Sequence, residues 1–498
     1  MPRHALWLCA CLPLVGCAVF GPYGTGPEGM TGFDTDLRRL ARAGEFERAL
    51  ELTEEGAGGA AGDDLLRLLH RAAVLRYAGE HAESNRLLQE AELEIDERYT
   101  RSVSRAALSL LANDRILAYR PPRVERLMVH YYGALNYLAL REPDEAAVEA
   151  RRLAALLDGS EEMEFDPGET YLRRALRYFT GAVFEAAREW NDAEVAYRNA
   201  WIGWDPAAPP IDPDTLTGDG QLARALVGIT PARLDRSAPL GTDSAEVVLI
   251  LESGFIAHRV QRSAAVPIYR RDRDAFGFGD EGARYDAGLC VAARVLGASY
   301  VGDRASRCYR PRGSSLFVVT AAWPALQGRS DGVTGGRLSA RGPDPAGPLA
   351  SLPASGPATA VWADSVPLGL TLDLSSAYAA EFEGRLGGTV AKAVARAATK
   401  YLVVEATKKA VKEEDETLGD VVGLLGNVAA IASEHADLRS WHLLPGALRI
   451  ARIRVPAGPV ELSVVLDQAG PAATRIIPLG SLSVAAGSVA VVDARVWP

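Results

Sequence analysis

The chain has 498 residues, which predicts about three domains, and its 48% hydrophobic and 24% charged content is ordinary for a globular protein. The formal net charge of −10 argues against nucleic acid as the main partner, because a phosphate-binding surface needs a basic face. Beyond the amino-terminal segment, no apolar run approaches the roughly 18 residues of a membrane-spanning helix, so no second anchor is expected.

Residues 1–16 have the pattern of a removable signal peptide. The basic Arg3 precedes an apolar run that is too short to cross about 30 Å of hydrocarbon as a helix. The run ends in Leu14-Val15-Gly16-Cys17, which resembles the lipobox of bacterial lipoproteins. In that family the cysteine is acylated and becomes the first residue of the mature protein, so the resemblance implies lipidation at Cys17. An ordinary secretory signal that contains cysteines by chance is the alternative.

Residues 17–34 are rich in glycine and proline, a composition that predicts a flexible tether. The residue after the lipobox cysteine is Ala18. In the lipoprotein family an aspartate at that position favours retention in the inner membrane. The resemblance therefore implies an outer-membrane anchor, with the body of the protein facing the periplasm and the lipid as its membrane contact.

Two cysteines remain outside the signal and the lipid site, Cys290 and Cys308. In an oxidising compartment they can form a disulfide that closes a loop of about 19 residues. Two buried thiols are the alternative.

Residues 35–205 show the apolar periodicity of helices, and four short segments within them echo one another. They resemble the tetratricopeptide repeat (TPR), whose paired helices need small residues where they cross and aromatic residues in the gaps. The resemblance implies an α-solenoid, although the units are unevenly spaced. The residues expected at its packing positions are Ala49, Ser84, Ala134, Tyr137, Ala146, Gly181, Phe184, Ala193, Tyr197 and Ala200.

The concave face of such a solenoid binds peptides or proteins. Tyr131 and Tyr178 occupy positions that face the groove in the repeat family, so the resemblance implies that they contact a partner. The alternative is that both tyrosines only pack against neighbouring helices. His70, His81 and His130 are not spaced as metal ligands, and neither a metal site nor a cofactor is predicted.

Residues 206–243 carry several prolines and are interpreted as a linker, after which residues 244–498 are expected to form an α+β domain. The apolar run 245–252 has no alternation, which predicts a strand buried on both faces, with 260–269 as its return. Residues 327–357 are rich in glycine, proline, serine and alanine, and we expect a long surface loop there.

Two helices are expected at about 375–414 and 418–434. The first has an apolar stripe from Val390 to Val404, and its basic face is expected in solvent, with an anionic lipid surface as the alternative. Strands at about 447–496 alternate as in a β-sandwich. A β-bulge is expected near residues 451–452, because the apolar phase slips there.

The carboxy-terminal half resembles a family of uncharacterised bacterial lipoproteins that combine helical repeats with a carboxy-terminal α+β domain. The most specific part of the match is the string Asp437, Arg439, Ser440, Trp441, Leu444 and Pro445. We expect the aspartate–arginine pair and the tryptophan to lock a helix-to-strand corner; a ligand-binding pair is the alternative. The resemblance implies architecture and location, and no established activity.

The sequence thus predicts a multidomain α + β protein, with a TPR-like α-solenoid followed by a β-rich domain with two packed helices. The predicted function is a lipid-anchored scaffold that binds other envelope proteins through the groove, with cell-wall or outer-membrane assembly suggested by analogy. No Gly-x-Ser-x-Gly, His-Glu-x-x-His or phosphate-loop motif is present, so neither an enzyme nor a small-molecule substrate is predicted. A periplasmic hydrolase, or a structural subunit of a surface or export assembly, is the alternative.

Overall fold

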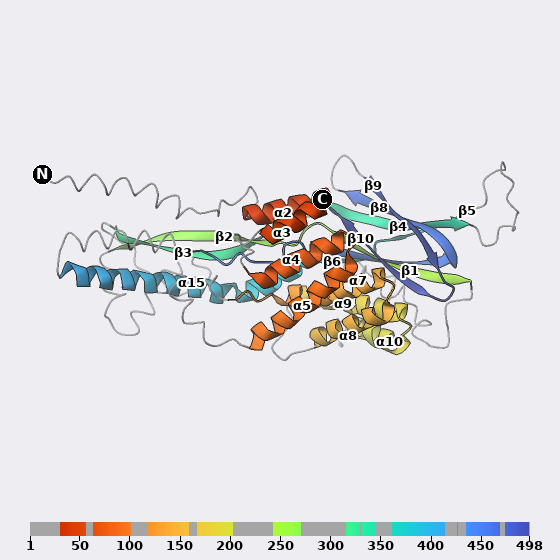
Figure 1. Ribbon diagram of the computed structural model, residues 1–498, viewed down its shortest axis with the longest axis horizontal. Helices are drawn as coiled ribbons and strands as arrows, with labels where there is room; N and C mark the ends of the chain where they lie inside the picture. The colour runs from red at the N-terminus through yellow and green to blue at the C-terminus, as the bar shows by residue number, and fades with distance from the viewer. Residues whose placement is uncertain are drawn as a thin grey trace.

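The computed structural model describes residues 30–55, 63–100, 118–158, 167–202, 243–269, 315–328, 331–343, 361–413, 426, 435–468 and 474–497. Within them the architecture is mixed α/β, with helices mostly in the amino-terminal half and strands mostly in the carboxy-terminal half (Figure 1). Several predicted features lie outside the described residues: the predicted signal peptide, Cys17, the possible disulfide between Cys290 and Cys308, nearly all of the predicted linker, and all but one residue of the helix expected at 418–434.

The amino-terminal helices pack one on the next in chain order. In the described part of the chain they are α2 (Gly32–Ala43), α3 (Phe46–Glu55), α4 (Asp64–Tyr77), α5 (His81–Thr100), α7 (Arg123–Ala139), α8 (Pro143–Asp158), α9 (Pro167–Ala186) and α10 (Trp190–Ile202). Because the Thr31 hydroxyl accepts a hydrogen bond from the Asp34 amide and caps α2, the helix begins inside the segment predicted as tether.

Small residues lie where these helices cross. The alanines and the serine expected at packing positions are at most 3% exposed, and Tyr137 is half-buried. The clearest case is Gly181 of α9, where an added Cβ would lie 2.6 Å from the ring of Tyr197 in α10. The two helices can therefore approach this closely only because the position has no side chain.

The first sheet has the strand order β10-β1-β7-β6 and lies against the helices. Its strands are β1 (Ser244–Ser253), β6 (Leu370–Asp373), β7 (Ala447–Pro456) and β10 (Val489–Val496). β1 is buried on both faces: Val248 and Ile250 belong to the core shared with the helices, while Leu249 and its neighbours belong to a second core. The continuous apolar run is thereby explained, and the prediction of a doubly buried strand is confirmed.

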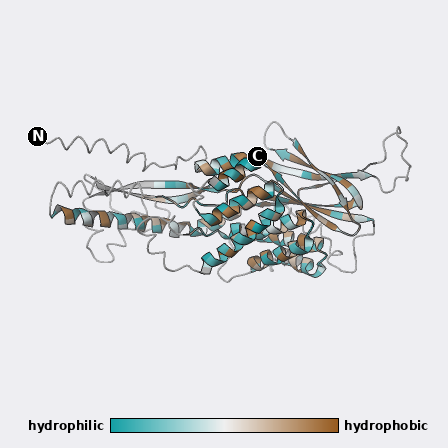
Figure 2. Cartoon of the chain, in the orientation of Figure 1, coloured by the Kyte–Doolittle hydropathy of each residue, from teal (hydrophilic) through white to brown (hydrophobic). Residues whose placement is uncertain are grey.

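The second sheet has the strand order β5-β4-β8-β9 and covers the other face of the first. Its strands are β4 (Val333–Pro343), β5 (Val361–Pro367), β8 (Gly458–Gln468) and β9 (Thr474–Val484). The described body therefore has three layers, namely helices, first sheet and second sheet (Figure 1). Figure 2 shows hydrophobic and hydrophilic residues interleaved along the strands of the second sheet, as expected for an outer sheet with one face in the core.

Strand β4 contradicts the surface loop expected at 327–357. It pairs with β5 on one side and β8 on the other. At Gly336 an added Cβ would lie 2.6 Å from the carbonyl oxygen of Val465. The glycines that suggested a loop therefore serve a close approach between strands. Residues 344–360 lie outside the described part of the chain.

The β-bulge expected at residues 451–452 is also wrong. β7 pairs with β1 without a register shift from Ala447 to Pro456. Leu448 and Ile450 pack toward the helices, whereas Ile453 and Val455 pack toward the second sheet. The apolar residues change face because both faces of β7 are buried, and the alternation of side chains is intact.

Strands β2 (His258–Tyr269) and β3 (Ser315–Gln327) pair with each other, so β2 is not the return strand of β1 that the sequence suggested. This two-stranded ribbon and α15 (Leu374–Lys412) extend together away from the layered body (Figure 1). The predicted apolar stripe of α15 is confirmed from Val390 to Tyr401, since residues of this segment pack with Ala321 of β3.

The side chain of Asp373 caps the amino-terminal end of α15. The basic face of α15 was expected in solvent, but Arg396 on that face is only 1% exposed.

No helix of the described part of the chain combines the length and apolar content needed to cross a membrane.

Candidate functional site

The inner face of the helices is closed by the first sheet. α7 contacts β10, and α9 contacts both β10 and β6. Tyr131 and Tyr178 are 0% and 1% exposed, and they belong to the same core as Trp441 and Val489. The prediction that these tyrosines line an open groove is therefore wrong, because the chain's own sheet occupies the face on which a partner was expected.

Buried ion pairs join the two layers. The guanidinium of Arg452 in β7 lies 2.7 Å from the carboxylate of Glu185 in α9 and also contacts Glu246 of β1. All three side chains are at most 8% exposed. Arg76 of α4, which is buried, pairs with the partly exposed Asp493 of β10. Buried pairs of this kind fix the layers relative to each other, since separating them would leave charges without partners.

The string that carries the resemblance leads into β7, and its aspartate–arginine pair and tryptophan pack as expected for a corner; the helix expected before it lies outside the described residues. Arg439 donates hydrogen bonds to Asp437, at 2.8 Å, and to Asp63 at the start of α4, at 3.2 Å. The side chains of Arg439 and Asp437 are 6% and 22% exposed, and Trp441 is fully buried. The sequence did not reveal the partner Asp63, through which the corner contacts the helices as well as its own strand. Ser440, Leu444 and Pro445 are buried in the same corner.

A buried carboxyl group lies behind this corner. Glu125 of α7 accepts hydrogen bonds from the Tyr119 hydroxyl and from the amide of Trp441, the latter at 3.0 Å. Burial raises the pKa of Glu125 to about 7, because the desolvated anion is disfavoured more strongly than its hydrogen bonds and the nearby Arg259 favour it. Glu125 therefore titrates near neutral pH. Because it accepts a hydrogen bond from the Trp441 amide, its pKa reports whether the corner is folded against α7.

Three potential metal ligands meet at the same seam. Asp34 of α2, His70 of α4 and His442 of the corner offer ligand atoms that all lie within 4.8 Å of one another. The His442 ring lies 4.3 Å from the His70 ring, centre to centre, and its Nε2 lies 3.0 Å from an Asp34 oxygen. These residues are 7%, 0% and 2% exposed. Sequence spacing gave no signal for the cluster, because 408 positions separate Asp34 from His442.

The protonation states of the cluster follow from its burial. Desolvation lowers the pKa of His70 well below its ordinary value, and that of His442 is lowered for the same reason despite the adjacent carboxylate. Burial alone would raise the pKa of Asp34, but His442 outweighs it and the net pKa is lowered. Neutral imidazoles and an ionised carboxylate are the ligand forms that divalent transition metals need.

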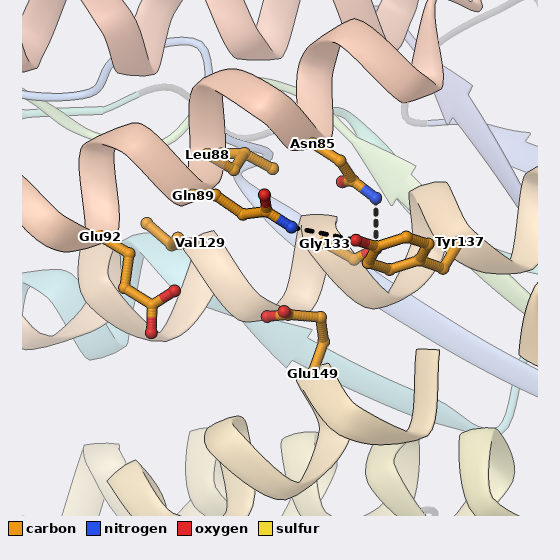
Figure 3. A pocket seen from close by; sticks show the side chains of 8 residues that line it. All are labelled: Asn85, Leu88, Gln89, Glu92, Val129, Gly133, Tyr137 and Glu149. Carbon is orange, nitrogen blue, oxygen red and sulfur yellow. Dashed lines mark hydrogen bonds between the residues drawn. The ribbon is translucent and has the colours of Figure 1, made fainter. Parts of the chain in front are cut away.

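A shallow hollow, with room for little more than a water molecule, opens between α5, α7 and α8 (Figure 3). Within it the Gln89 amide donates to the Tyr137 hydroxyl at 3.0 Å, and the Asn85 amide donates to the Gly133 carbonyl at 3.4 Å. Its two carboxylates are already engaged, Glu149 by His130 and Glu92 by Arg152. The full lining is Asn85, Leu88, Gln89, Glu92, Val129, Gly133, Tyr137 and Glu149.

Comparisons with protein-family models, with curated proteins and with solved structures find no match to this chain.

Replacing Arg452 with methionine tests the ion pair between the layers. Arg452→Met leaves Glu185 and Glu246 buried without this cation, so the free energy of unfolding should fall by about 3–5 kcal/mol in urea denaturation. Arg341→Met is the matched control, because Arg341 pairs with Glu461 across an exposed pair of strands at 69% and 55% exposure. Its effect should stay within about 1 kcal/mol. Equal losses in both variants would contradict the buried-pair interpretation.

Glu125 should make stability depend on pH. The folded protein binds this proton more tightly than the unfolded chain, so the contribution is fully present below about pH 4.5 and is lost as the pH rises through about 7. At about 1.4 kcal/mol per pKa unit, the loss is about 3 kcal/mol.

Urea denaturation from pH 4.5 to 8 checks this: Glu125→Gln should remove that part of the pH dependence, whereas Glu461→Gln on the exposed face of β8 should keep the wild-type profile. An unchanged profile in Glu125→Gln would show that the carboxyl group does not titrate in this range.

Proposed function

We propose that this chain is a lipid-anchored envelope protein that acts as a scaffold for other envelope proteins, with its TPR-like helices as the recognition layer. The lipobox resemblance at Cys17 supports the anchor and, with Ala18 after it, an outer-membrane location facing the periplasm. Helix pairs that cross at small residues, as α9 and α10 do at Gly181, support the repeat interpretation. Cell-wall or outer-membrane assembly is the process that the analogy favours.

The observation that carries this proposal is that the two faces of the helical layer differ: one is covered by the first sheet and the other is exposed. Its inner face is occupied by the protein's own sheet, so the partner surface we propose lies on the outward helices α5, α8 and α10. Figure 1 shows α8 and α10 at the edge of the molecule opposite β9. These helices expose large apolar side chains: Leu93 is 73% exposed, Trp190 45% and Val195 56%. An exposed tryptophan such as Trp190 commonly anchors protein interfaces, with neighbouring apolar side chains excluding water around it.

A tether gives such a surface reach and a raised effective concentration near the membrane. On the outward side, Arg151 of α8 forms ion pairs with Asp192 of α10 and with Glu189 just before that helix; these pairs are partly exposed and contribute little to stability. A rigid folded domain that is joined to a lipid anchor by a flexible tether is sufficient to hold a partner near the membrane. This arrangement does not require an open groove.

Cys17→Ser tests the anchor. With no thiol to acylate, the variant should move from the membrane fraction to the aqueous fraction and should lose incorporation of labelled fatty acid. Cys11→Ser, a change to another cysteine of the signal region, should keep both properties. Membrane retention of Cys17→Ser, together with no acyl chain on the wild-type protein, would contradict the proposal.

Site-specific photocrosslinking tests the partner surface. A crosslinker at Leu93, Trp190 or Val195 should capture a common envelope protein in cells, and capture should fall when Cys17→Ser is added. The control position is Ile476 of β9, which is 68% exposed but lies in the second sheet. Capture of the same protein from Ile476, or no capture from any of the three helical positions, would refute the outward-face assignment.

A further inference from the structure

Three separate elements hold the side chains of the Asp34–His70–His442 cluster in place. Asp34 lies in the first turn of α2, where its amide donates to the capping hydroxyl of Thr31 at 3.1 Å. His442 is positioned through its backbone, because the Arg38 guanidinium donates to its carbonyl at 2.8 and 3.1 Å. His70 lies in the interior of α4. The three side chains are thus brought together by contacts that do not depend on a ligand.

The cluster contains more donor atoms than its own hydrogen bonds use. Both ring nitrogens of His70 and Nδ1 of His442 have no hydrogen-bond partner among the described residues, and all three atoms are buried. The one hydrogen bond within the cluster joins His442 to Asp34. Buried polar atoms are normally satisfied, so three unsatisfied nitrogens at one point require an explanation.

We propose that Asp34, His70 and His442 bind one divalent transition-metal ion, with Zn²⁺ as the best match. Two imidazoles and one carboxylate form a three-ligand set that is common for zinc, and a water or the second Asp34 oxygen can complete four-coordination. Such an ion takes up a lone pair of His70, which otherwise has no partner. It also replaces the proton that His442 and Asp34 now share.

The donor set argues against hard cations. Ca²⁺ and Mg²⁺ need several oxygen ligands, whereas this cluster supplies one carboxylate and two nitrogens. Arg38 is a cationic side chain beside the cluster, and its charge opposes any weakly bound ion. A metal with strong affinity for imidazole is therefore required, which again favours zinc over calcium or magnesium.

The role that follows is structural. The site is almost fully buried, and it joins α2 and α4 to the corner that leads into β7. Because the unfolded chain separates these residues, the ion binds the folded state preferentially and stabilises it. This inference does not rest on the proposed scaffold function, and either can fail without the other.

Metal titration of the full chain tests the proposal. After treatment with a chelator and dialysis, the protein should bind one Zn²⁺ or Co²⁺ per chain, measured by elemental analysis. The cobalt form should show the strong visible absorption of four-coordinate sites, and Zn²⁺ at about 100-fold excess over Kd should raise Tm by several degrees. X-ray absorption of the zinc form should count two imidazole ligands without any mutation.

Two histidine variants locate the site. His70→Gln should weaken Co²⁺ binding by at least about 100-fold and abolish the effect of Zn²⁺ on Tm. The matched control is His130→Gln, since His130 is also buried but binds Glu149 outside the cluster; it should keep metal binding. Absence of stoichiometric metal on the wild-type chain, an absorption spectrum without imidazole ligands, or undiminished binding by His70→Gln would each overturn the proposal.

Discussion

The contact between the helices and the first sheet is the constraint on which the rest of the structure depends. Neither layer is stable as an exposed surface, because α7 and α9 present tyrosines and leucines while β1 presents a continuous aliphatic run. Once these faces meet, the charges that lie between them must be paired, and Arg452 with Glu185 and Arg76 with Asp493 meet that requirement. The two halves of the chain therefore form a single body.

The corner at residues 437–446 supplies several of the polar interactions between the helices and the first sheet. Within a few residues it contributes Arg439 to a pair with Asp63, the Trp441 amide to Glu125, and His442 to Asp34. These partners belong to α4, α7 and α2, or to the residue that caps one of them. A small displacement of the corner would disturb an ion pair, a titrating carboxyl group and the proposed zinc ligands together. A single substitution in the corner can therefore affect contacts to several helices, unlike a substitution in a connecting segment that contacts only its neighbours.

Much of the local structure could be predicted from the sequence. The doubly buried β1, the strands near 447–496 and the stripe of α15 follow from apolar periodicity, which depends only on neighbouring residues. What failed depended on tertiary contacts. Tyr131 has the same apolar surroundings whether a partner or the protein's own sheet covers it, and Gly336 has the composition of a loop although it serves strand packing. His70 and His442 meet only after the whole chain has folded, so no spacing rule could have joined them.

The pairing of β1 with β10, the last strand of the chain, affects how the protein folds during its synthesis. Strand β10 covers part of α7 and α9, yet it is synthesised long after those helices. During translation, just over three hundred residues are added between the end of α9 and the start of β10, so the apolar surface that β10 covers stays exposed until then. A nascent chain in that condition is a natural client for holding chaperones.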